Sequence, residues 1–204
     1  MKVLSTNGVR LALEKNLPPG VEVTFGTTAD LKNAIEGGAH FDVAILASAA
    51  MDDLAKKGKV VAGTCAEVGK SGAGVAIREG ARRPDLSSSE AFRRTLLSAK
   101  SVAYVGTSAT AGNLRDIFKR LGIAREMKAK SKLLAGVLTA EAVAKGEAEL
   151  GLTQISEIVD VPGAVLAGPF PPELQVYTVF TAAVSAVASD PAAARAFVEH
   201  LASR

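Results

Sequence analysis

Short apolar runs alternate with amphipathic helical runs through the first half of the chain. The pattern predicts strands at 2–5, 21–25 and 41–46, and helices at 9–15, 29–36 and 49–57. Within the second helix, Leu31, Ala34 and Ile35 have the spacing of one helix face, and Gly37-Gly38 ends it. The run FDVAIL is apolar enough to be a central strand buried on both faces. Such alternation is typical of parallel βαβ units, so the predicted fold class is α/β.

A second α/β series begins at Ser87. It predicts helices at 89–99, 109–121 and 139–145, and strands at 101–105, 126–130 and 148–153. The later run LQVYTVFTAAV, 174–184, is long and β-branched, and Asp190-Pro191 opens a last helix at 192–201. A long strand after a complete second series suggests that the chain returns to its first lobe.

The glycine-rich segment GKSGAG, 69–74, separates two β-like runs between 60 and 77. It is interpreted either as a flexible hairpin loop or as a hinge between lobes. Together with the returning strand, the hinge interpretation predicts one lobe made of 1–72 plus 174–204 and a second made of 73–173. The expected architecture is therefore two-lobed, with a ligand cleft between the lobes.

Composition narrows the function classes. Hydrophobic residues make up 48% of the chain and charged residues 22%, which are values of a folded protein and not of a disordered one. The net charge of +3 is scattered among acidic residues, so no nucleic-acid partner is expected, although small anions are favoured. No run of about 18 apolar residues occurs, so no membrane insertion is expected.

Few residues are available for metal or nucleophilic chemistry. Cys65 is the single cysteine, and His40 and His200 are the two histidines. No metal site and no cofactor are therefore expected. The start MKVLSTNGVR lacks the pattern of a secretory leader, which leaves two locations open: the periplasm if a leader is removed, and otherwise the cytoplasm.

Several strand-to-helix junctions are rich in hydroxyl, amide or glycine residues. In an open α/β sheet these junctions lie at the carboxyl ends of strands, where free N–H groups and helix dipoles can hold an anion. An alternative is that Thr28, Thr107, Ser108 and Thr139 are only helix N-caps. The four junctions are 5–8, 26–28, 106–110 and 136–139.

Nucleotide binding and acid/base catalysis have weaker signals. GKSGAG lacks the spaced glycine of a phosphate-binding loop and leads into a β-like run. The pairs Asp52-Asp53 and Glu147/Glu149 lie on polar faces, where solvated charge is the default. A binding protein without catalytic residues, and not an enzyme, is therefore expected.

The chain resembles the molybdate-binding-protein-like substrate-binding proteins of ABC transporters, which have the type II periplasmic binding fold. The resemblance covers almost the whole chain, and its most specific part is VTFGTTADLKNAIEGGAHFDVAILAS. The other segments that carry it are KVLSTNGVRLALE, MDDLAKKGKVV, TAEAVAKGEAELGLTQISEI and DPAAARAFVEHLAS.

The resemblance implies a protein that closes around a small, anionic ligand, an oxyanion or organic acid, and delivers it to an ABC permease. Thr28 matches the ligand-binding hydroxyl residue of the second junction. Gly8 stands where the molybdate pattern has Ser, and Gln154 stands where it has Tyr, so the ligand's identity stays open. The expected ligand-binding residues are Asn7, Gly8, Thr27, Thr28, Thr107, Ser108, Thr110, Thr139 and Gln154.

Two other functions remain open for this fold. One is an intracellular ligand sensor, which the missing leader pattern favours. The other is an enzyme built on the two-lobed fold by adding catalytic residues to its cleft.

Overall fold

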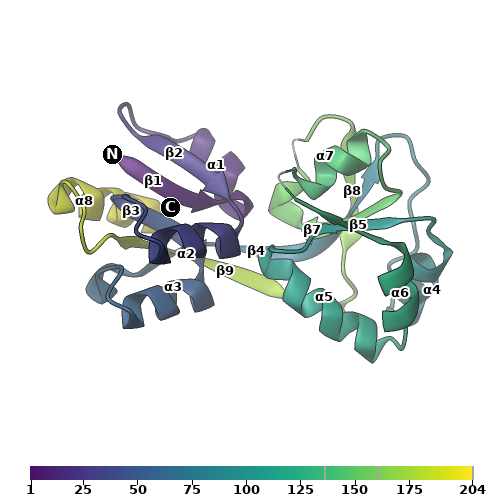
Figure 1. Cartoon of the computed structure of the whole chain (residues 1–204). Helices are drawn as coiled ribbons and strands as arrows, with labels where there is room; N and C mark the ends of the chain where they lie inside the picture. The colour runs from purple at the N-terminus through teal and green to yellow at the C-terminus, as the bar shows by residue number, and fades with distance from the viewer. Residues whose placement is uncertain (136, 160, 204) are drawn as a thin grey trace. The chain divides into compact units, whose positions relative to one another are not determined.

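The computed structural model describes residues 1–135, 137–159 and 161–203. The chain divides into two compact units (Figure 1). Unit 1 comprises Met1–Lys70 and Thr178–Arg204, and unit 2 comprises Ser71–Tyr177. Two strands, β4 (Ala66–Arg78) and β9 (Tyr177–Val184), contain the points where the chain passes from one unit to the other.

Unit 1 is an α/β layer structure around a mostly parallel sheet. Strand β1 (Lys2–Thr6) pairs in parallel with β2 and β3, and β9 pairs antiparallel with β3. The predicted α/β class is thus confirmed. The remaining elements of the unit are η1 (Asn7–Val9), α1 (Arg10–Glu14), β2 (Glu22–Gly26), α2 (Thr28–Glu36), β3 (Val43–Ala47), α3 (Ser48–Lys56), η2 (Ala62–Thr64) and α8 (Pro191–Ala202).

Alternate residues of β3 supply two hydrophobic clusters, one on each face of the sheet. Val43 and Ile45 pack with Phe197 of α8, whereas Ala44 and Leu46 pack with the helices α2 and α3. All four strand residues are at most 1% exposed. Because side chains alternate across a strand, an apolar run of this kind is stable only when both faces are covered.

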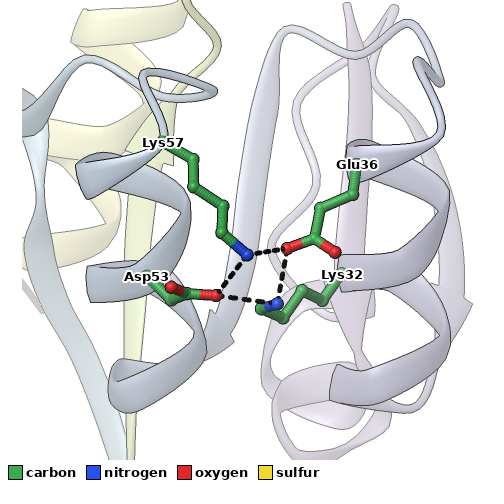
Figure 2. Close-up of polar contacts among 4 residues, drawn as sticks. All are labelled: Lys32, Glu36, Asp53 and Lys57. Atoms are coloured by element: carbon green, nitrogen blue, oxygen red, sulfur yellow. Dashed lines mark hydrogen bonds and ion pairs between the residues drawn. The ribbon is translucent and has the colours of Figure 1, made fainter.

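Helices α2 and α3 are joined at the surface by four charged side chains (Figure 2). The Lys32 ammonium lies 2.8 Å from Asp53, and the Lys57 ammonium lies 2.8 Å from Glu36 and 3.0 Å from Asp53. These lysines hold the pKa values of Glu36 and Asp53 below their usual range. The network fixes the pairing of the two helices but is exposed to screening by salt.

Unit 2 also combines parallel and antiparallel pairing. Strand β5 (Val102–Val105) pairs in parallel with β6 and β7, while β4 pairs antiparallel with β7 and β8. The other elements are α4 (Ser89–Ser98), α5 (Ala109–Arg120), α6 (Ala124–Lys130), β6 (Ser131–Leu134), α7 (Thr139–Ala144), β7 (Leu150–Gln154), η3 (Ile155–Glu157), β8 (Ala164–Pro169) and η4 (Pro172–Leu174).

Strand β7 has helices on both of its faces, with α7 on one side and α5 and α6 on the other (Figure 1). Leu150 and Leu152 belong to the cluster that includes Phe118 of α5. The opposite cluster contains Val143 of α7. On that side Gly151 allows close packing, because a Cβ added to it would lie 2.8 Å from Thr139 Cγ2.

Of the two interpretations of the glycine-rich segment 69–74, the flexible hairpin loop is wrong, because the segment lies inside the continuous strand β4; the chain passes from unit 1 to unit 2 within this segment. Its glycines permit close approach: a Cβ on Gly74 would lie 2.8 Å from Ile155 Cγ1 and 2.9 Å from Leu166 Cδ1. Because glycine has no side chain, η3 and β8 can pack directly on the strand.

One further prediction about local structure was wrong. Residues 126–130 were expected as a strand, but they belong to helix α6, whose sequence AREMKAK consists of good helix formers. In the part of the chain that the structure describes, no helix is long and apolar enough to cross a membrane.

Candidate functional site

The carboxyl ends of β1, β2 and β3 meet at one edge of unit 1. Thr6 is opposite Gly26, and Ser5 is opposite Ile45, so the segments that follow all three strands begin side by side. Asn7 and Gly8 lie there in η1, with Gly8 buried. The structure therefore brings together the first two predicted junctions, as expected for a parallel sheet.

Thr28 links the ends of two strands at this edge. It is 8% exposed, and its hydroxyl donates to Thr6 Oγ1 and accepts from the Ala47 N–H, both at 3.4 Å. Hydrogen bonds of this length are weak, so the Thr28 hydroxyl is oriented by its neighbours but is not strongly bonded to them.

Thr27 is the N-cap of α2. Its Oγ1 accepts from the Asp30 N–H at 3.2 Å and donates to Asp30 Oδ2 at 2.6 Å. Capping of this kind accounts for a threonine at that position without any ligand. The nine-residue α2 nevertheless presents the positive end of its dipole to the same edge.

Sequence reasoning missed two residues of this edge. Ser48 begins α3 directly after β3, and its hydroxyl is 2.7 Å from Thr181 Oγ1 and donates to Val179 O at 3.1 Å. Its position after a strand and before a helix was the available signal. Arg10 places its guanidinium 5.0 Å from the ring centre of Phe25, near the end of β2, and pairs with Glu14.

In unit 2, the carboxyl ends of three parallel strands also share one edge. Val105 of β5 is opposite Leu134 of β6, and Ala103 is opposite Gly151 of β7. This alignment brings together the segments that follow the three strands. Gly136, the first residue of the fourth predicted junction, lies outside the described residues.

Three predicted residues belong to the junction between β5 and α5. Thr107 is exposed, and Ser108 is the N-cap residue of α5 but makes no side-chain capping bond. Thr110, in the first turn of this helix, is only 2% exposed.

Two buried polar atoms at this edge have no hydrogen-bond partner among the described residues. They are Oγ1 of Thr139, at the start of α7, and Oε1 of Gln154, at the end of β7. Thr139 is 1% exposed and Gln154 is 3% exposed. Because an unpaired buried polar atom is costly, its presence in a native fold requires an explanation, and ligand binding supplies one.

Glu157 was not among the predicted site residues. It ends η3, three residues after Gln154, and accepts a hydrogen bond from Thr153 Oγ1. Burial raises the pKa of the Glu157 carboxyl, and the bond from Thr153 opposes that effect only in part. A carboxyl with a raised pKa is a stronger proton acceptor than an ordinary carboxyl.

The remaining candidates for chemistry lie elsewhere. Burial and the charge of Asp52 raise the pKa of the Cys65 thiol, which disfavours its thiolate. Among the described residues, no group of three or more His, Cys, Asp or Glu side chains is placed to hold a metal ion.

Comparison with known proteins identifies relatives of two kinds. Residues 18–204 match the family described as bacterial extracellular solute-binding protein. An aconitate isomerase from a Pseudomonas species is 30% identical over 217 residues, a match that covers 100% of this chain and 82% of the relative.

Solved structures share the fold at low sequence identity. The periplasmic molybdate-binding protein of Azotobacter vinelandii has a TM-score of 0.78 at 17% identity, covering 98% of this chain and 92% of that one. A sulfate-binding protein of Mycobacterium tuberculosis has a TM-score of 0.72 at 17% identity, and the match covers 99% of this chain and 81% of that one. These likenesses confirm the predicted type II periplasmic binding fold, whereas specificity for molybdate is not confirmed.

The expectation that the chain is not an enzyme was wrong. It rested on the few histidines, the single cysteine and the lack of a recognisable acid/base pair. A relative that matches the whole chain is named as an isomerase, which shows that a sequence of this kind is compatible with catalysis. The chain belongs to the bacterial extracellular solute-binding protein family and has the type II periplasmic binding fold.

Proposed function

We propose that the protein binds a small organic acid with several carboxylates and isomerises it, with aconitate as the first substrate to test. The observation that carries this proposal is the 30% identity to an aconitate isomerase across the full length of this chain. The ligand-binding role of the family supplies the first half of such a reaction, which is capture of a small solute.

The strand-end residues of both units suit a carboxylate ligand. Hydroxyls such as those of Thr28 and Ser108, together with N–H groups at the starts of α2 and α5, are donors that an anion needs. Arg10 adds a positive charge near the end of β2. We propose that the predicted strand-end residues of each unit, Gln154 of unit 2 among them, bind carboxylate groups.

Isomerisation of aconitate requires proton transfer and no oxidant. The molecule has a central carbon that carries a carboxylate, a double bond to one CH–COO⁻ group and a single bond to a CH₂–COO⁻ group. Moving a proton from the CH₂ carbon to the other terminal carbon shifts the double bond without changing the formula. The geometry at the new double bond can then be opposite to that of the old one.

The activity is tested by mixing the purified protein with cis-aconitate and following the vinyl proton by NMR. We expect trans-aconitate to form at a rate proportional to protein concentration. An unchanged spectrum, in the presence of demonstrated aconitate binding, would refute the isomerase proposal.

Ligand binding by the strand ends is tested with Thr28→Val and Gln154→Leu. Each variant removes polar groups that we propose contact a charged ligand, so the affinity for aconitate should fall about tenfold or more. The matched control is Thr24→Val, because Thr24 is an exposed residue of β2. Titration calorimetry at constant salt measures all three variants, and wild-type affinity in both site variants would show that the ligand binds elsewhere.

A second candidate function is capture of an anion and its delivery to an ABC permease from the periplasm. The family match and the fold shared with molybdate- and sulfate-binding proteins favour it. This function predicts tight binding of a ligand without turnover. Titrations with molybdate, sulfate and aconitate distinguish the candidates, since a transport protein would bind its ligand and return it chemically unchanged.

A further inference from the structure

Glu157 lies on a face of unit 2 where other polar groups gather. Thr153 is two residues from Gly151 on β7, so their side-chain positions are on the same face of the strand. That face is covered by α7, because the Thr139 methyl group packs against Gly151. Glu157 joins this face through its hydrogen bond from Thr153.

The backbone that carries Glu157 is fixed from a neighbouring strand. The Ser156 N–H and hydroxyl both donate to Ser71 Oγ of β4, at 3.2 and 3.0 Å. Ile155 packs over Gly74 on the same strand. The carboxyl is therefore held by a rigid support, as proton transfer at a defined carbon atom requires.

Glu157 has no cation to neutralise it among the described residues. The charged residues on the packed elements are Glu141 of α7, Lys145 just after it, and Glu67, Lys70 and Arg78 of β4; the pKa of Glu157 is shifted by burial and by the Thr153 bond, not by any of these charges. Structural carboxylates that a fold withdraws from water are normally paired. A carboxyl without a paired cation, on the face of β7 that also carries the unpartnered Thr139 hydroxyl, indicates a site that a ligand completes.

Resting on the proposed isomerase function, we propose that Glu157 is the catalytic base that moves the proton between the two terminal carbons of the substrate. Thr153 is the positioning residue, because its hydroxyl orients the carboxylate. The raised pKa of Glu157 makes its carboxylate a stronger base than an ordinary one.

The step balances without a co-reactant. A Glu157 oxygen forms an O–H bond as a C–H bond of the CH₂ group breaks. The electron pair of that bond forms a double bond to the central carbon, while the original double-bond pair moves to the other terminal carbon, next to its carboxylate. That carbon takes the proton from Glu157, which returns to its carboxylate form.

The test compares Glu157→Gln with wild type. We expect kcat for aconitate isomerisation to fall by about 10²-fold or more, with little change in aconitate affinity, because only the base is lost. In D₂O, wild type should exchange substrate protons and the variant should not. Glu149→Gln is the matched control, since it removes a carboxylate at the opposite end of β7 and should leave kcat unchanged.

Two further variants decide the question if Glu157→Gln folds poorly. Glu157→Asp keeps a carboxylate and should retain more activity than the amide. Thr153→Val removes the hydrogen bond that lowers the pKa of Glu157, so the limb of the kcat profile that reports the base should move to higher pH.

The outcomes separate the two proposals. An inactive wild type that binds aconitate overturns the isomerase function. If the wild type is active, two results would overturn only the assignment of Glu157. One is a kcat of Glu157→Gln within about threefold of wild type, because a general base contributes far more than threefold to kcat. The other is a pH profile of kcat that does not move in Thr153→Val.

Discussion

Asp42 in unit 1 and Glu157 in unit 2 are carboxylates that the fold withdraws from water in opposite ways. Asp42 is 5% exposed and accepts hydrogen bonds from the Lys2 N–H at 2.7 Å and the Ser189 N–H at 2.8 Å. Burial acts to raise the pKa of Asp42, but these bonds outweigh it and hold the pKa below its usual range. Glu157 receives one bond, from Thr153, and its pKa is raised.

The difference between the two acids separates a structural role from a functional one. Asp42 precedes β3 and bonds to the start of β1 and to the segment before α8, so it holds three parts of unit 1 together. Glu157 follows the carboxyl end of β7, the edge at which ligands bind in α/β sheets. A satisfied carboxylate stabilises the fold, whereas an unsatisfied one retains the capacity to accept a proton.

The largest expected effect is the loss of stability in Asp42→Ala. This change leaves two backbone N–H groups without their charged acceptor, so the free energy of unfolding should fall by about 2–4 kcal/mol at pH 7. Urea denaturation measures it. Asp116→Ala is the control, because that side chain is 75% exposed and about 0.5 kcal/mol or less is expected. A difference between the two variants of less than about 1 kcal/mol would contradict the structural role of Asp42.

A smaller loss is expected from a methyl group added to the face of β7 that α7 covers. In Gly151→Ala the new Cβ would lie 2.8 Å from Thr139 Cγ2 and 2.9 Å from Val143 Cγ2, so α7 has to shift. The cost should be about 1–3 kcal/mol, as for other overpacked cores. Gly112→Ala in α5 is the matched control; its Cβ meets nothing within 4 Å, and a gain of about 0.5–1 kcal/mol is expected. Equal stability of the two variants would mean that α7 packs more loosely.

Much of the fold could be predicted because hydrophobic periodicity reports burial directly. The run FDVAIL was expected to be buried on both faces, and β3 is. The hairpin interpretation of the glycine-rich segment was wrong because its glycines accommodate side chains from η3 and β8, which are distant in sequence. The strand predicted at 126–130 was wrong because a short, charged run has no clear hydrophobic period. The helix propensity of its residues determines the structure there.

The candidate site could be predicted only as far as strand ends reveal it. Hydroxyl residues after a strand, such as Thr28, are visible in the sequence, and Ser48 follows the same rule. Glu157 could not be found this way, since its raised pKa comes from tertiary burial and from the lack of a paired cation. The sequence ISEI shows only a carboxylate in a turn.

The smallest expected effect is a difference in pH dependence between Glu157→Gln and Asp42→Asn. A raised pKa in the folded state means that the native protein binds the proton more tightly than the unfolded chain. The Glu157 contribution to stability is therefore fully present below the ordinary glutamate pKa and is lost as pH rises through the folded value. Consequently Glu157→Gln should be more stable than wild type at pH 7, and its advantage should shrink toward pH 4.

For Asp42 the sign is reversed: its stabilisation is present above the ordinary aspartate pKa and is lost as pH falls through the lowered one. Asp42→Asn should thus be less stable than wild type at pH 7 and approach it in acid. Thermal melts of the three proteins from pH 3 to pH 8 measure both trends, and parallel curves for wild type and Glu157→Gln would show that Glu157 titrates in the fold as it does in water.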